Sequence, residues 1–335
     1  MPTSSEPDQG ASAVSSIPDT YQGLSEYIQR LPQPANLWAL RERTMKEIEA
    51  KTGRPLISYV SKTAAQSPID DSDLAGFSDL VRSTDGENLD VFLTSNGGSP
   101  EAAERIVRLL RARFHNIRYI VAGNAFSAAT MICFSGDSIL MSLEGTLGPI
   151  DPQIGGVPAR AILRGFDSLE GRLKTEGPKA LPAYIPMLSK YDLHILEICK
   201  SAQDLSRELA VTWLSEYMWK CDPADKKITD AVDFFSDYDI HKSHGRSIDR
   251  VKAADTLNVQ NTETVGIDSL VRSLYNQYTI WFDSTSFIKN YECVRGIHWG
   301  RQLQQATFTL PFLPQPGPHP LAPVLPQPVK PVSLT

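Results

Sequence analysis

Between residues 56 and 143, short apolar runs alternate with amphipathic segments. The runs are rich in β-branched and aromatic residues, and they predict strands at LISYVS (56–61), LDVFLT (89–94), IRYIVA (117–122) and SILMSL (138–143). Apolar positions at helical spacing predict helices between them, at 70–83, 100–113 and 125–136. Because strands and helices alternate, this region predicts an α/β fold in which helices cover a parallel sheet.

Further helical patterns lie on both sides of this region. Residues 36–51 place apolar side chains at near-helical spacing, and Gly53 and Pro55 follow as stop signals. The patterns over 187–220 and 267–289 predict long C-terminal helices.

The two ends of the chain differ in composition from its body. Nine of the 24 prolines fall in residues 311–335, which contain no Asp or Glu and show no helical period. We therefore expect three parts: a flexible N-terminal segment (1–35), a globular body (36–300) and a Pro-rich tail (301–335).

Composition narrows the class of protein. The 335 residues are 41% hydrophobic, which is enough for a packed core and excludes global disorder. The net charge of −6 argues against nucleic acid as a partner. Four scattered cysteines, with neither a secretory leader pattern nor about 18 unbroken apolar residues, predict a reduced cytoplasmic protein without a transmembrane segment.

Cofactor and metal motifs are absent from the sequence. It contains neither GxxxxGK[ST] nor GxGxxG, and no His, Cys or Asp residues stand at zinc-ligand spacing. We expect no cofactor and no metal.

Two features follow predicted parallel strands, where open α/β sheets place their sites. Gly97 and Gly98 come after the strand at 89–94, and they let the backbone approach a ligand closely or form a plain turn into the next helix. Ser127 opens the buried helix at 125–136. Its hydroxyl is either a nucleophile near the positive helix end or an ordinary N-cap.

Two later motifs offer the groups that a serine nucleophile needs. Asp151 lies in LGPIDPQ, between Ile150 and Pro152, and the proline favours extended backbone there. His244 lies in SHGRSID, a loop-like sequence. A serine becomes nucleophilic when a base and an orienting acid lie beside it, and such a triad is recognised by geometry, not by chain order.

Four motifs in this order resemble the serine dehydrogenase proteinase family: TSNGGSPEAAERIVRLLR, NAFSAATMICFSGDSILM, LGPIDPQ and SHGRSID. This family belongs to the Clp/crotonase-like serine peptidases, which are related to signal peptide peptidase A. The resemblance covers roughly residues 55–290. It implies a ClpP-like spiral of ββα units with a parallel sheet and a nucleophile at Ser127. It also implies an oxyanion hole from the amides of Gly98 and Ala128, with Gly97 and Ser99 beside the substrate.

The resemblance leaves two candidates for the general base. In Clp proteases a histidine stands about where Asp151 stands here, so a triad of Ser127, His244 and Asp151 exchanges the histidine and acid positions. The rival is a Ser–Lys dyad as in signal peptide peptidase A, and Lys179 lies near the required interval. A lysine base needs burial to lower its pKa, and the sequence around Lys179 shows none, so we favour His244.

The sequence thus predicts a soluble serine endopeptidase that cleaves peptide or protein substrates through an acyl-enzyme. Since Clp-like folds stack their subunits into rings, we also expect a homo-oligomer. Two departures from the family pattern keep an alternative open: Ala129 stands where many relatives have Gly, and Asn96 stands where Clp proteases often have Pro. The alternative is an inactive Clp-fold scaffold that binds partners through its Pro-rich tail.

Overall fold

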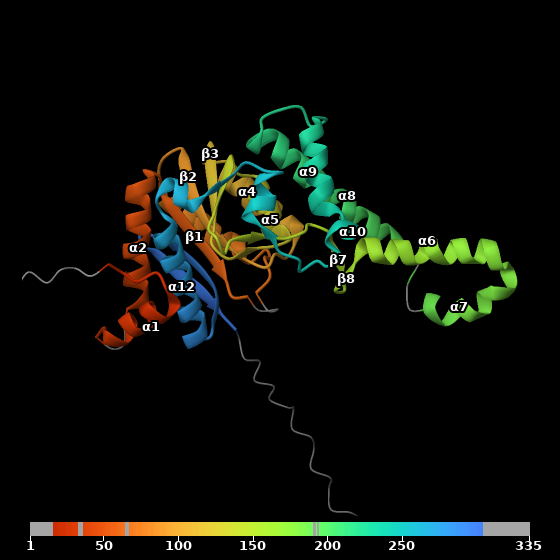
Figure 1. The fold of residues 1–335 in the computed structure, drawn as a ribbon, viewed down its shortest axis with the longest axis horizontal. Coiled ribbons are helices and arrows are strands. Elements are labelled where there is room, and N and C mark those ends of the chain that lie inside the picture. Colours follow the sequence, from red (N-terminus) through yellow and green to blue (C-terminus); the bar gives the residue numbers. More distant parts are fainter. Residues whose placement is uncertain (1–15, 33–35, 64–66, 190–191, 193, 304–335) are drawn as a thin grey trace, which may run out of the picture. The chain divides into compact units, whose positions relative to one another are not determined.

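The computed structural model describes residues 16–32, 36–63, 67–189, 192 and 194–303, and a seven-stranded sheet lies at its centre (Figure 1). The strands of this sheet are β1 (Leu56–Ser61), β2 (Asn88–Thr94), β3 (Asn116–Val121), β5 (Ser138–Met141), β10 (Val259–Asn261), β11 (Phe287–Cys293) and β12 (Ile297–Gln302). They are ordered β10-β5-β3-β2-β1-β11-β12. The five strands from β10 to β1 run parallel, whereas β11 and β12 are antiparallel to their neighbours.

Helices cover both faces of the sheet (Figure 1). Those that pack around it are α1 (Tyr21–Arg30), α2 (Leu37–Thr52), α3 (Asp73–Ser83), α4 (Pro100–Arg111), α5 (Ala128–Phe134), α8 (Ile195–Trp213), α9 (Lys226–Ser236), α11 (Arg250–Ala254) and α12 (Asp268–Ser284). The remaining helices are α6 (Ala159–Glu176), α7 (Leu181–Leu188) and α10 (Tyr238–His241), with short helical turns at Pro178–Ala180, Leu214–Met218 and Thr262–Val265.

Side-chain alternation along the strands divides the core into two layers. In β1, Ile57 and Tyr59 join the layer that contains α3, α4 and α5. Leu56 and Val60 point to the other face and pack with residues of α2 and α12. Because successive strand residues point to opposite faces, a strand that is buried on both faces is apolar throughout, as in a parallel sheet between helices.

Several predicted elements are confirmed. β1 has the predicted bounds, and β2, β3 and β5 agree with the predicted strands to within two residues at each end. The helix predicted at 36–51 is α2, which the Asn36 side chain caps by accepting from the Ala39 amide. Gly53 ends it with a φ of 67°, in the left-handed region that glycine adopts without a Cβ penalty. The α/β fold with a parallel-rich sheet is therefore the one observed.

The two long C-terminal helices are shorter than predicted. The pattern over 187–220 becomes α8, which starts at Ile195 and runs into a π-helical turn at Leu214–Met218. The pattern over 267–289 ends as a helix at Ser284, and its last residues belong to β11. Residues 289–293 pair with β1, and this ladder satisfies their backbone groups within the sheet.

The predicted flexible segment 1–35 contains a helix. Residues 21–30 form α1, whose Leu24 is fully buried and whose N-terminus is capped by Thr20. This helix packs on α12, and Asp19 forms an ion pair with Arg272 at 2.5 Å (Figure 1). At the other end, β12 runs to Gln302, so the expected body of 36–300 stops inside a strand. The rest of the Pro-rich tail lies outside the described residues.

None of the helices in the described part of the chain is long and apolar enough to cross a membrane. The four cysteines are all free thiols, and three of them are buried.

A partly buried carboxylate ties β5 to its neighbours. Asp137 accepts a hydrogen bond from the Ile117 amide at 2.8 Å and forms ion pairs with Arg111 at 3.1 Å and Lys220 at 2.9 Å. Desolvation alone would raise the pKa of Asp137. The hydrogen bonds from Lys220 and Ile117, together with the Arg111 charge, outweigh it and hold this pKa below its ordinary value.

Replacing Asp137 with asparagine should therefore destabilise the fold in a pH-dependent way. The folded-state pKa is the lower one, so the carboxylate stabilises the fold above its unfolded pKa and loses this effect as the pH falls. We expect Asp137→Asn to lose about 1.5–3 kcal/mol of unfolding free energy at pH 7 and clearly less at pH 3. Urea unfolding measures both values. The exposed Asp85 serves as control, and an Asp137→Asn deficit that is equal at both pH values would contradict the assignment.

Candidate active site

A cavity of about 790 Å³ lies beyond the carboxyl end of β2. Its wall contains four of the residues that the sequence singled out: Gly97, Gly98, Ser127 and His244. Ala128 lines it as well. The cavity thus collects segments that lie up to 177 positions apart in the chain, from Ser67 to His244, as expected for a site at the carboxyl edge of a parallel sheet.

A second, three-stranded sheet brings these segments together. Its strands are β4 (Asn124–Ala125), β6 (Thr146–Leu147) and β9 (Ile248–Asp249), in the order β4-β6-β9. β4 ends two residues before Ser127, β6 ends four residues before Asp151, and β9 begins four residues after His244. Backbone pairing of three short strands therefore fixes the starting points of the three loops that carry these side chains.

Ser127 has a backbone conformation that most residues avoid. Its φ is 53° and its ψ is −121°, and only two other non-glycine residues of the described chain have positive φ. Its hydroxyl does not cap α5 and makes no hydrogen bond to another described residue, so the N-cap interpretation does not apply. A backbone conformation of this kind costs about 1–3 kcal/mol, and here it places an unpaired hydroxyl at the cavity wall.

The glycine pair packs directly against this serine. A Cβ on Gly97, whose φ is 92°, would lie 2.7 Å from the Cβ of Ser127 and 3.0 Å from the amide nitrogen of Ala128. A Cβ on Gly98 would lie 2.2 Å from the carbonyl oxygen of Ile69. Only glycine fits at either position, because a side chain would push the loop off the serine or off residue 69.

Two backbone amides at this contact lack protein acceptors. Among the described residues, neither the Gly98 amide nor the Ala128 amide donates a hydrogen bond. Both residues line the cavity. Two free N–H groups at the wall next to a serine are what an oxyanion hole requires.

His244, which lines this cavity, forms a pair with Asp151. The distance from His244 Nδ1 to Asp151 Oδ1 is 2.8 Å. Asp151 is 3% exposed, and its other oxygen accepts from the Gln153 side chain at 2.9 Å. Because a carboxylate accepts hydrogen bonds and cannot donate one, the neutral tautomer that fits this contact has its proton on Nδ1 and its lone pair on Nε2.

The loop that carries Asp151 is anchored to the helix that follows the serine. The Gly148 amide donates to Thr130 Oγ1 at 3.0 Å, and this oxygen lies 2.6 Å from the Ala125 carbonyl and 2.9 Å from the Gly148 carbonyl. One threonine thereby connects β4, α5 and the LGPID segment. The sequence analysis did not single out Thr130, since a threonine in an apolar helix carries no distinct signal.

The structure brings some predicted residues together and separates others. No hydrogen bond joins Ser127 to His244 in the described chain, although both line the cavity, and catalytic hydrogen bonds are often long in unliganded enzymes. Lys179 lies exposed at the end of α6, outside the residues that line the cavity. Ser99 is also absent from the wall, because its hydroxyl caps α4 by accepting from the Ala102 amide.

Helix α8 supplies a wall that the sequence did not assign to the site. Ile198, Ala202 and Leu205 line the cavity, together with Met131 and Ile150. These side chains belong to the helical apolar pattern over 187–220, and that pattern alone does not distinguish a core face from a cavity wall. Ser201, from the same helix, is exposed at the cavity and makes no hydrogen bond to the described residues.

No group of three or more His, Cys, Asp or Glu side chains suited to a metal ion occurs in the part of the chain that the structure describes.

The chain is similar to several known proteins. Two uncharacterized proteins of Methanocaldococcus jannaschii are similar: one is 35% identical over 79 residues, and the other is 24% identical over 198 residues. These matches cover 24% and 53% of this chain. The chain spans only 28% of the first relative's length and 66% of the second's.

A solved structure is similar at low sequence identity. It is a lysine-to-alanine mutant of the membrane-bound stomatin-specific protease 1510-N, in complex with a substrate peptide. The identity is 14% and the TM-score is 0.36, over 58% of this chain and 70% of that one.

The family comparison is the more direct one. Residues 32–175 match the family of ClpP-like SDH-type serine proteinases. The matched segment contains the glycine pair, Ser127 and Asp151, and it ends before Lys179 and His244. Over residues 32–175, this chain is therefore similar to the ClpP-like SDH-type serine proteinase family.

Proposed function

We propose that the chain is a serine peptidase that hydrolyses peptide bonds through an acyl-enzyme on Ser127. One observation carries the proposal: a strained serine with an unpaired hydroxyl shares a cavity with His244, whose Nδ1 lies within hydrogen-bond distance of Asp151. The unpaired amides of Gly98 and Ala128 support it, since they supply the remaining part of an acyl-transfer site.

Each group would have a separate role in the reaction. As Ser127 Oγ attacks the substrate carbonyl carbon, its proton passes to His244 Nε2. The carbonyl oxygen becomes an oxyanion and accepts hydrogen bonds from Gly98 and Ala128, each worth about 2.7–4 kcal/mol in the transition state. The His244 imidazolium then donates its proton to the leaving amine, and water releases the acyl group by the reverse steps.

The geometry favours His244 over Lys179 as the base. A lysine base must be buried so that it is neutral near pH 7, and Lys179 is exposed. The Asp151 carboxylate holds the imidazole in the tautomer that accepts a proton at Nε2 and stabilises the imidazolium that forms. In the proposed triad, Asp151 therefore orients the imidazole of His244.

Self-association and a cytoplasmic location stay predictions. The scaffold alternative, in which the Pro-rich tail binds partners, concerns residues outside the described part of the chain. It predicts that the body has no hydrolytic activity.

Hydrolysis of an unfolded protein tests the proposal. We expect the purified chain to release fluorescent peptides from heavily labelled casein, and a serine-directed organophosphorus fluoridate to abolish the release. Release that continues after complete reaction with the inhibitor would contradict a serine mechanism. A chain that neither cleaves casein nor reacts with the inhibitor would favour the scaffold.

A further inference from the structure

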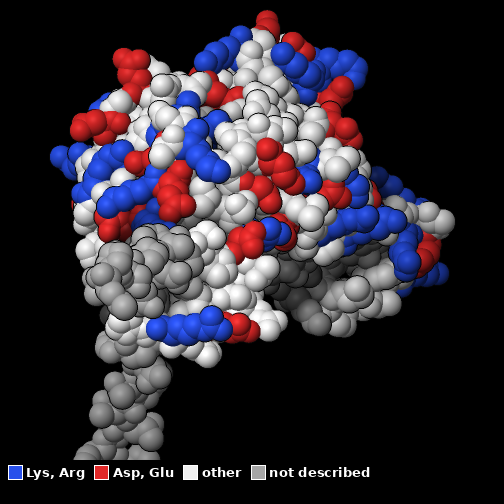
Figure 2. Space-filling model, turned by 60° about the vertical axis from the view of Figure 1, so that its left-hand side comes forward, with Lys and Arg blue, Asp and Glu red and all other residues white. Residues whose placement is uncertain are grey.

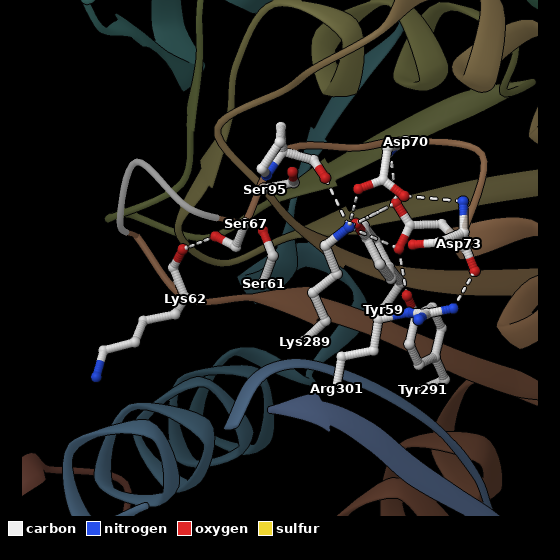
Figure 3. Close-up of polar contacts among 12 residues, drawn as sticks. Tyr59, Ser61, Lys62, Ser67, Asp70, Asp73, Ser95, Lys289, Tyr291 and Arg301 are labelled. Atoms are coloured by element: carbon white, nitrogen blue, oxygen red, sulfur yellow. Dashed lines mark hydrogen bonds and ion pairs between the residues drawn. The ribbon is translucent and has the colours of Figure 1, made fainter. Parts of the chain in front are cut away.

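A buried cluster of charged groups lies beside the site and has no role in the reaction described above. Lys289, on β11, is 2% exposed, and Asp73, the first residue of α3, is fully buried. The Lys289 ammonium lies 2.9 Å and 3.0 Å from the two carboxylate oxygens of Asp73, and 3.3 Å from Asp70 (Figure 3). Burying two charges costs several kcal/mol each before pairing, so the cluster calls for an explanation.

Hydrogen bonds satisfy the Asp73 carboxylate. It accepts from the hydroxyls of Tyr59 and Tyr291 and, at 2.9 Å, from the amide of Asp70 (Figure 3). Burial, together with the Asp73 charge, raises the pKa of both tyrosines, so they remain donors over the whole physiological range. The Lys289 ammonium has three donors, and the one left beyond the carboxylates is directed to a backbone carbonyl.

That carbonyl belongs to the segment that supports the glycine pair. Lys289 Nζ donates to the Pro68 carbonyl at 2.6 Å. The next residue, Ile69, donates its amide to the Gly97 carbonyl and accepts from the Ser99 amide, both at 2.8 Å. A Cβ on Gly98 would lie 2.2 Å from the Ile69 carbonyl oxygen. The backbone of Ile69 therefore packs directly against Gly98, and its two hydrogen bonds hold the residues on either side of Gly98.

A continuous set of contacts therefore runs from the cluster to the Gly98 amide. The ion pair fixes Pro68 and Asp70, these residues hold Ile69 between them, and Ile69 forms a bridge with the backbone around Gly98. An oxyanion hole works only if its donors lie at the right distance before the charge develops, so the support behind them affects the rate.

We infer that Lys289 and Asp73 are positioning residues, which set the Gly98 amide in the oxyanion hole by holding residues 68–70 behind it. The inference rests on the proposed function. Replacing a buried ion pair by neutral groups of similar volume is often neutral for stability. The pair then acts by fixing the geometry of residues 68–70, and its removal slows the chemical step.

The same strand offers a matched control. Glu292, three residues after Lys289, points to the opposite face of β11 and forms an ion pair with Arg41 at 2.7 Å. Both side chains of this pair are at most 2% exposed. They pack among residues of α2 and α12, on the face of the sheet away from the glycine pair. The two pairs thus match in type, burial and strand, and they differ in which structure they support.

The experiment compares two double variants of the full chain. In Lys289→Met/Asp73→Asn, we expect kcat to fall at least about 10-fold with KM changed less than about 3-fold. The reason is that the Gly98 amide, which donates to the oxyanion in the transition state, moves. In Arg41→Met/Glu292→Gln, we expect kcat within about 2-fold of the wild type. Melting temperatures of both variants are measured in parallel. Equal losses of kcat in the two variants, or an unchanged kcat in the first, would overturn the inference.

Amide hydrogen exchange gives a readout that does not depend on activity. We expect the amides of Ile69 and Ser99 to exchange at least about 10-fold faster in Lys289→Met/Asp73→Asn and at the wild-type rate in Arg41→Met/Glu292→Gln. Unchanged exchange at both amides in the first variant would contradict the support of the loop by the cluster. A wild-type chain that is inert toward casein and inhibitor contradicts the proposed function instead, and exchange still decides whether the cluster fixes the loop.

Discussion

Replacing Ser127 with alanine is expected to lower the rate of hydrolysis by roughly 10⁴-fold or more, since no acyl-enzyme can then form. The fold should be unaffected, because the hydroxyl makes no hydrogen bond to the described residues and alanine adds no atoms. The change in unfolding free energy should stay within about 0.5 kcal/mol. Casein hydrolysis and urea unfolding, measured on the same preparation, check both parts.

Ser201 provides the matched control for this substitution. It lies on the wall of the same cavity, on α8, and its hydroxyl is also without a partner in the described chain. Ser201→Ala should hydrolyse casein within about 2-fold of the wild-type rate. A Ser127→Ala variant that keeps even a tenth of the activity would exclude this serine as the nucleophile.

Removing the His–Asp pair is expected to have the second-largest effect. His244→Ala should lose about 10³–10⁴-fold in kcat, because the proton acceptor of the proposed triad is then absent. Asp151→Asn should lose a similar factor. An amide nitrogen can donate to His244 Nδ1, which would place the imidazole proton on Nε2 and remove the lone pair that the serine needs.

Lys179→Ala is the control for the base, since Lys179 lies exposed and away from the cavity wall. It should keep the wild-type kcat. Activity that survives in His244→Ala and disappears in Lys179→Ala would instead establish the Ser–Lys dyad. Stopped-assay rates at saturating casein, from variants with matching melting temperatures, separate these outcomes.

Local sequence patterns predicted the elements whose own residues favour the structure that they adopt. β1 is a short β-branched and aromatic run after Pro55, and its bounds agree with the prediction. The helix α1 was missed because a polar, Pro-containing head is typical of disordered termini. Its one fully buried side chain, Leu24, finds its partners on α12, almost 250 residues away. Residues 287–289 were assigned to a helix for the same reason, since their strand partners lie on β1 and β12.

The residues of the candidate site could be named from the sequence, whereas the residues that support them could not. Gly98, Ser127, Asp151 and His244 each lie in a motif, and the order of the motifs pointed to them. Lys289 lies in the run FIKNYEC, where nothing shows that a lysine is buried, and its partner Asp73 is 216 positions away. Contacts of this kind arise from the sheet order, which places β11 next to β1, and the sequence of either segment contains no sign of the other.

The most direct measurement is the location of the covalent adduct after reaction of the wild-type chain with a fluorophosphonate probe. Intact-mass and peptide mass spectrometry give its stoichiometry and its position. Our account predicts one adduct per chain, on Ser127, that forms at least about 10³-fold more slowly in His244→Ala. An adduct on any other residue, or no adduct in a folded wild-type chain, would contradict it.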